Sequence, residues 1–136
     1  MKILVIGLGS MGKRRVRNLL ELKIDVILGY DQREDRRDES KELYKINIFD
    51  NLKLALEEKP DGVIISTSPN SHKEYALIAA EKRIPFFTEV NTMHPNDMQE
   101  IIDSLEKNQV KATPSSNVMF HPSVIKIQEI LIAKKI

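Results

Sequence analysis

A glycine-rich turn that directly follows a short apolar run is the feature that most limits how this chain can fold. The apolar run is residues 3–6, and residues 7–12 then follow the pattern GxGxxG. Val16, Leu19 and Leu20 lie at helical spacing after the turn, so a helix is expected to begin at the glycines. A strand, a glycine turn and a helix in this order are typical of a site where backbone amides approach a phosphate group.

Further short apolar runs recur along the chain, and amphipathic stretches separate them. The predicted strands are residues 3–6, 26–30, 46–49, 63–65, 86–87 and 110–113. The predicted helices lie around residues 16–23, 75–80, 98–105 and 124–131, with a short one after an N-cap at Asp50. Because most strands lack polar alternation, helices are expected to cover both faces of a parallel sheet. The sequence therefore predicts an α/β fold, a Rossmann-type doubly wound parallel sheet with strand order 3-2-1-4-5-6.

Composition narrows the classes of function. The 136 residues have the length of one domain, and 21 basic against 20 acidic side chains argue against a nucleic-acid partner. The absence of cysteine excludes disulfides and thiolate sites, and three widely spaced histidines make a metal site unexpected. No apolar run approaches the ~18 residues of a membrane span, so we expect a cytoplasmic domain without a membrane partner. The mixed charges of residues 31–42 predict a solvated helix or loop.

An acidic residue stands where a dinucleotide site needs one. Asp31 follows Gly12 by 19 residues, at the end of the second predicted strand, where a carboxylate accepts hydrogen bonds from the adenosine ribose. This position favours NAD, because a carboxylate repels the 2′-phosphate of NADP. Arg33 offers the alternative, since its guanidinium could pair with that phosphate. Of the three basic residues at 13–15, at least two are expected to face solvent, and one could touch a phosphate.

The loop at residues 66–72 follows the fourth predicted strand. Ligands of such sheets bind beyond the carboxyl ends of the strands, so this loop is expected to line the nicotinamide side. Asn70 and Ser71 have two readings, as caps of the next helix alone or as caps that also touch the cofactor. His72 has the same ambiguity.

Several segments together resemble the Gfo/Idh/MocA family of glucose–fructose oxidoreductase and inositol dehydrogenase. They are residues 7–12, 17–19, 60–65, 68–72 and 117–122, and the last two are similar to the family's Thr-Pro-Asn-x-x-His and Asn-x-Arg-Phe-His-Pro. The resemblance implies an NAD(P)-binding domain of an enzyme that moves a hydride to or from a sugar, cyclitol or sugar derivative. It also implies a second, substrate-binding domain that residues 1–136 do not include.

The residues expected to hold the cofactor combine the turn, the acid, the loop and the family positions. They are Gly7, Leu8, Gly9, Ser10, Met11, Gly12, Asp31, Gln32, Arg33, Ser66, Thr67, Ser68, Pro69, Asn70, His72, Glu89 and Asn117. The chain departs from the family where Glu-Lys-Pro is usual, because Val90 follows Glu89, and Met119 stands where arginine is common. Neither Val90 nor Asn91, which follows it, can act as a cationic acid. No catalytic residue is therefore expected to be intact, and Glu89 and His72 are the remaining candidates.

Two other functions compete with the cofactor domain of an NAD-dependent oxidoreductase. One is a non-catalytic dinucleotide-sensing or interaction module that has lost the family's lysine. The other is a domain that binds a nucleotide sugar or another ligand in the same crevice. The isolated chain is expected to bind NAD and to turn over substrate poorly or not at all.

Overall fold

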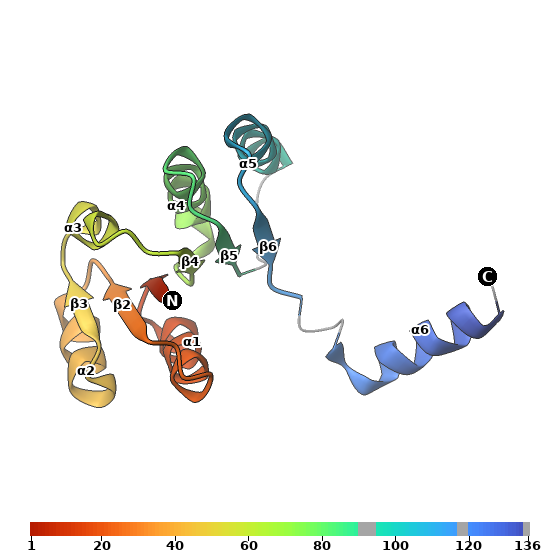
Figure 1. Ribbon diagram of the computed structural model, residues 1–136, viewed down its shortest axis with the longest axis horizontal. Helices are drawn as coiled ribbons and strands as arrows, with labels where there is room; N and C mark the ends of the chain where they lie inside the picture. The colour runs from red at the N-terminus through yellow and green to blue at the C-terminus, as the bar shows by residue number, and fades with distance from the viewer. Residues whose placement is uncertain (90–94, 117–119, 135–136) are drawn as a thin grey trace.

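The computed structural model describes residues 1–89, 95–116 and 120–134 (Figure 1). Its strands are β1 (Lys2–Ile6), β2 (Val26–Tyr30), β3 (Asn47–Phe49), β4 (Gly62–Ile65), β5 (Phe86–Thr88) and β6 (Ala112–Pro114). Its helices are α1 (Ser10–Glu21), α2 (Glu34–Tyr44), α3 (Leu52–Glu57), α4 (Pro69–Glu81), α5 (Pro95–Asn108) and α6 (Pro122–Lys134).

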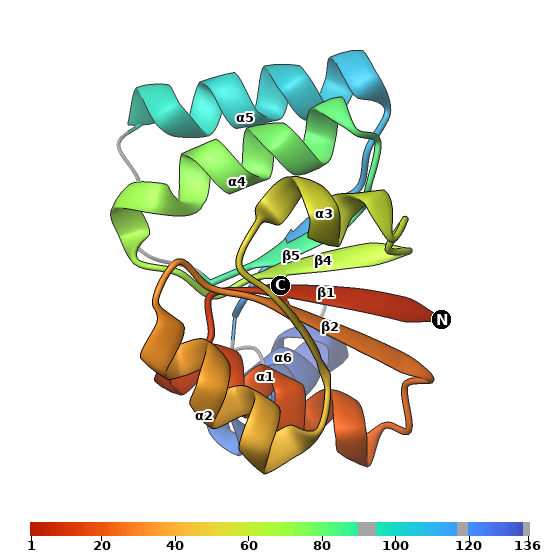
Figure 2. The same cartoon turned by 90° about the vertical axis from the view of Figure 1, so that its left-hand side faces the viewer.

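The described strands form one parallel sheet in the order β3-β2-β1-β4-β5-β6, which confirms the predicted topology. Figure 2 shows α1 and α2 on one face of the sheet and α3, α4 and α5 on the other. The chain changes faces between β3 and β4, so the helices that follow β1 and β4 diverge. The carboxyl ends of these two central strands, at Ile6 and Ile65, therefore border the crevice where ligands bind in doubly wound sheets.

Apolar side chains from both faces of β1 are buried, which explains its unbroken apolar run. Leu4 and Ile6 pack in the core beneath α3, α4 and α5, whereas Val5 packs against Val16 of α1 on the other face. Complete burial of a side chain of this size contributes about 1.5–3 kcal/mol. Tyr75 and Ala76 of α4, within the helix predicted around residues 75–80, are buried in the same core as Leu4 and Ile6.

Two local predictions change in detail. The N-cap of α3 is Asn51 and not Asp50, because the Asn51 side chain accepts a hydrogen bond from the backbone N–H of Lys53 at 2.9 Å. The charged stretch after β2 is a helix, α2, with Glu34 and Asp35 in its first turn and Lys41 in its last. Charges in this order stabilise a helix through its dipole, and this explains why so polar a segment is helical.

The last helix lies apart from the sheet (Figure 1). The predicted helix around Val124, Ile127 and Leu131 is confirmed as α6, but its apolar residues do not join the core, and Ile127 and Leu131 are exposed. No helix in the described part of the chain is long and apolar enough to cross a membrane.

Candidate functional site

The turn between β1 and α1 needs glycine at both of its ends. Gly7 has a φ of 90°, and a Cβ there would lie 2.8 Å from the carbonyl carbon of Ser66. A Cβ on Gly12 would lie 1.7 Å from the carbonyl oxygen of Gly7. A side chain at position 7 would therefore clash with Ser66, just after β4, and one at position 12 would clash with the backbone of the turn itself, as the glycine pattern predicts.

The middle glycine is less crowded. A Cβ on Gly9 would meet only the guanidinium of Arg36, whose Nη1 lies 3.4 Å away. Gly9 is also the N-cap of α1, with no side-chain cap and no acidic residue in the first turn. The first amides of a helix have no partner within the helix, and its dipole is positive at this end. Bare glycine backbone at an uncapped helix start fits the diphosphate of a dinucleotide.

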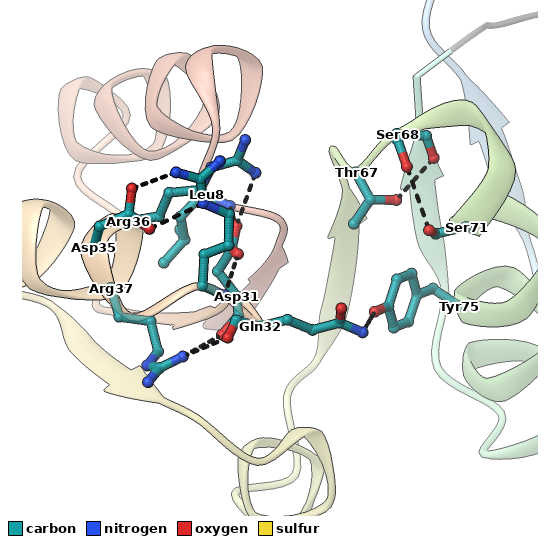
Figure 3. Close-up of polar contacts among 11 residues, drawn as sticks. Leu8, Asp31, Gln32, Asp35, Arg36, Arg37, Thr67, Ser68, Ser71 and Tyr75 are labelled. Atoms are coloured by element: carbon teal, nitrogen blue, oxygen red, sulfur yellow. Dashed lines mark hydrogen bonds and ion pairs between the residues drawn. The ribbon is translucent and has the colours of Figure 1, made fainter.

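Asp31 ties the glycine turn to the end of β2. Asp31 is 5% exposed, and its carboxylate accepts a hydrogen bond from the backbone N–H of Leu8 at 2.7 Å (Figure 3). It accepts a second one from the backbone N–H of Arg33 at 2.9 Å. Each carboxylate oxygen has two lone pairs, so both can accept a further hydrogen bond. Asp31 therefore stabilises the turn and can still accept a hydrogen bond from a ribose hydroxyl.

Three arginines near the start of α2 make different contacts close to this acid. Arg33 turns away and pairs with Asp35 at 2.6 Å, with both side chains more than 60% exposed. Arg36 approaches the acid instead, with Nη1 3.5 Å from Oδ2 of Asp31, and Arg37 donates to the carbonyl oxygens of Asp31 and Gln32. Sequence reasoning singled out Arg33 and missed Arg36. Arg36 lies three residues after Arg33, in the first turn of α2, and this helical spacing was the available signal.

A cleft of about 260 Å³ lies between the end of β2 and the start of α4. Its walls are Gly7, Tyr30, Asp31, Gln32, Arg33, Arg36, Thr67, Ser68, Ser71 and Tyr75. Figure 3 shows residues of the two walls facing each other, and the Gln32 amide donates to the Tyr75 hydroxyl across the cleft at 3.3 Å. The structure thus brings together the predicted acid and the predicted serine-rich loop.

Tyr75 is a wall residue that the sequence placed only in a predicted helix and not at the site. Its side chain is 4% exposed, and its ring meets Tyr30 edge to face at 6.4 Å. Burial raises the pKa of the Tyr75 phenol from its ordinary value near 10 to about 12, so the hydroxyl keeps its proton well into the alkaline range. It therefore offers the cleft a hydroxyl group that both donates and accepts hydrogen bonds.

The loop after β4 is positioned by the start of α4. Pro69 is the first residue of the helix and Ser68 is the N-cap, without a side-chain cap. The capping role considered for Asn70 and Ser71 is therefore wrong. Asn70 is exposed, and the Ser71 hydroxyl lies 3.4 Å from the hydroxyl of Ser68. Ser66, directly after β4, has a buried hydroxyl for which the described part of the chain offers no hydrogen-bond partner.

His72 lies inside the protein and not on the cleft. It is 0% exposed, and its Nε2 lies 3.0 Å from the carbonyl oxygen of Thr67. This contact fixes the backbone of the loop after β4 from the buried side. A direct contact of His72 with a ligand remains a prediction.

Glu89 lies beyond the end of β5 and is held by α1. Its Oε1 accepts a hydrogen bond from Nε of Arg15 at 2.7 Å. Arg15 is therefore paired, and its side chain is largely covered, whereas Arg14 is exposed and Lys13 pairs with Glu39 at the surface. Three other positions of interest, Val90, Asn117 and Met119, lie outside the described residues.

A parallel sheet in this order, with a glycine turn and an uncapped helix start at its switch point, defines a dinucleotide-binding domain of the Rossmann type. The model of the oxidoreductase family with an NAD-binding Rossmann fold, Gfo/Idh/MocA, matches residues 1–116. The chain belongs to this family, and the match favours the oxidoreductase prediction over the non-catalytic module.

Solved structures agree in fold. A probable dehydrogenase from Thermotoga maritima is 27% identical and superposes with a TM-score of 0.89, over 100% of this chain and 42% of that one. A myo-inositol 2-dehydrogenase from Lactobacillus plantarum is 17% identical, with a TM-score of 0.88 over 100% of this chain and 42% of that one. The WlbA dehydrogenase from Chromobacterium violaceum, in complex with NADH and UDP-GlcNAcA, is 14% identical, with a TM-score of 0.90 over 98% and 40%.

The chain therefore spans about two-fifths of the length of these structures. None of the curated proteins compared with the sequence matches it.

Proposed function

We propose that this chain is the cofactor-binding part of an NAD-dependent oxidoreductase that moves a hydride to or from a sugar, cyclitol or sugar derivative. The observation that carries the proposal is the start of α1, which begins at a glycine and has no side-chain cap. It lies beside a cleft that Asp31 borders. Family membership supports the cofactor class. The substrate class rests on the inositol dehydrogenase and the complex with UDP-GlcNAcA among the structural neighbours.

Different residues of the site would hold different parts of the dinucleotide. The turn from Gly7 to Gly12 and the first amides of α1 would hold the diphosphate, and Asp31 with Gln32 would accept and donate hydrogen bonds at the adenosine ribose. Residues 66–70 and Glu89, at the carboxyl ends of β4 and β5, would border the nicotinamide half. The bound cofactor supplies the hydride chemistry, and these residues orient it.

For the choice of cofactor we propose NAD over NADP. The Asp31 carboxylate borders the cleft and would repel a 2′-phosphate, while the Arg33 guanidinium is engaged with Asp35. Arg36, 3.5 Å from Asp31, offsets part of this repulsion. NADP is therefore expected to bind more weakly than NAD, without being fully excluded. The proposed setting is the cytoplasm.

Binding of the two cofactors to the purified chain tests the proposal. NAD at about 100 times its dissociation constant should stabilise the fold by about 2.7 kcal/mol, which a thermal or chemical unfolding experiment detects. Calorimetry with NAD, NADP and UDP-sugars then ranks the ligands. Stabilisation by a UDP-sugar without any by NAD would reject the proposal in favour of a nucleotide-sugar domain.

A further inference from the structure

An arginine on the helix that follows the glycine turn reaches the ends of two distant strands. Nε and Nη2 of Arg15 both contact Oε1 of Glu89, at 2.7 and 2.6 Å. Nη2 also donates to the hydroxyl of Ser115 at 3.4 Å, and the guanidinium carbon lies 4.8 Å from the centre of the Phe87 ring. Arg15 thereby links α1 to residues just beyond β5 and β6.

The position of this pair in the sheet is well defined. The backbone N–H of Glu89 donates to Ile65 at 3.2 Å, and that of Ser115 donates to Thr88 at 2.8 Å, so both residues continue the alignment of the strands. The Arg15 and Glu89 side chains are 15% and 11% exposed. Charges that are this well covered interact more strongly than charges at the surface, because little water screens them.

The contact uses only one side of the carboxylate. Both N–H groups of Arg15 contact Oε1, and Oε2 has no hydrogen bond among the described residues. Among the described residues, Arg15 is the one basic side chain that forms an ion pair with Glu89. Glu89 therefore keeps an acceptor for a ligand while a fixed cation balances its charge.

We propose that Arg15 is a positioning residue for Glu89, and that the pair limits how strongly the protein distinguishes oxidised from reduced dinucleotide. This rests on the proposed function, which puts Glu89 beside the nicotinamide half. The oxidised nicotinamide ring carries a positive charge that the reduced ring lacks. A carboxylate without a partner would favour the oxidised form, and the guanidinium of Arg15 offsets that preference.

The test is the ratio of two dissociation constants, for NAD⁺ and for NADH, measured by calorimetry on the full chain. Replacement of Arg15 by glutamine should shift the ratio towards tighter relative binding of NAD⁺, by about five-fold or more at low salt. Replacement of Glu89 by glutamine should shift it the opposite way. The double variant Arg15→Gln/Glu89→Gln should return close to the ratio of the unmodified chain.

Arg17→Gln is the matched control, because it removes the same charge from an exposed position of the same helix. Its ratio should stay that of the unmodified chain. Equal losses of NAD⁺ and NADH affinity in Arg15→Gln, with an unchanged ratio, would show a merely structural contact and overturn the proposal. If Arg15→Gln does not fold, an unchanged ratio in Glu89→Gln overturns it equally. Failure of the unmodified chain to bind either form would reject the proposed function, and this inference with it.

Discussion

The carboxylate of Asp31 accepts a hydrogen bond from the backbone N–H of Leu8 at 2.7 Å and so connects the end of β2 to the glycine turn. The two residues are 23 apart in the chain, and the contact is buried. One side chain therefore shapes the turn and also borders the cleft. Substitutions at Asp31 should change both stability and ligand affinity.

Replacement of Asp31 by alanine should cost about 1–3 kcal/mol of unfolding free energy, because the buried N–H of Leu8 loses its acceptor. It should also weaken NAD more than NADP, since only NAD gains from a carboxylate at the ribose. Urea unfolding and calorimetry measure the two effects separately. Equal losses of affinity for NAD and NADP would reject the assignment of Asp31 to the ribose and leave it only the role of stabilising the glycine turn.

Two glycines of the turn should respond differently to alanine. Gly12→Ala places a Cβ 1.7 Å from a backbone oxygen, so it should destabilise the fold by about 4 kcal/mol. Gly9→Ala meets only the end of the Arg36 side chain and should cost under about 1 kcal/mol. It should nevertheless weaken NAD at least ten-fold by blocking the approach of the diphosphate to the backbone.

Gly62→Ala is the control for Gly9→Ala, because it adds a Cβ at the start of β4, away from the cleft, next to the flexible end of Ile3. It should leave NAD affinity unchanged. Unchanged affinity in Gly9→Ala as well would place the diphosphate elsewhere.

Alanine variants of His72 and Asn70 should distinguish a residue that stabilises the loop after β4 from one that contacts the cofactor. His72→Ala removes a fully buried ring and its hydrogen bond to Thr67, so a loss of about 2–4 kcal/mol is expected from unfolding curves. Asn70→Ala, at an exposed position of the loop, should change stability by less than about 0.5 kcal/mol. Its expected effect is weaker NAD binding, and wild-type affinity in this variant would remove Asn70 from the site.

Stability should fall at alkaline pH because of Tyr75. Burial raises the pKa of its phenol to about 12, whereas an unfolded tyrosine titrates near 10. Between these values the unfolded chain releases the proton and the folded chain retains it, so the stabilisation present below about pH 10 is lost as pH rises towards 12. Urea unfolding at several pH values in this window, compared with Tyr75→Phe, measures the effect. Identical slopes in the two proteins would contradict it.

Much of the fold was predictable because its signals are local. The apolar run of β1 and the glycines at positions 7 and 12 reflect steric demands of a few neighbouring residues, and they located the first strand, turn and helix. The alternation of such units then indicated the strand order, since parallel strands need crossover connections of one hand. The N-cap of α3 was misplaced by one residue because Asp50 and Asn51 are both good caps.

The sequence by itself determined the class of sheet, the glycine turn and the acid at the end of β2, since each depends on residues close together in the chain. Only the tertiary structure decided that Arg36 and not Arg33 approaches Asp31, that Tyr75 forms a wall of the cleft, and that Arg15 pairs with Glu89. The physical reason is that side chains 74 residues apart, such as Arg15 and Glu89, meet only when the sheet aligns its strand ends. Charge composition cannot distinguish a solvated arginine from a buried one.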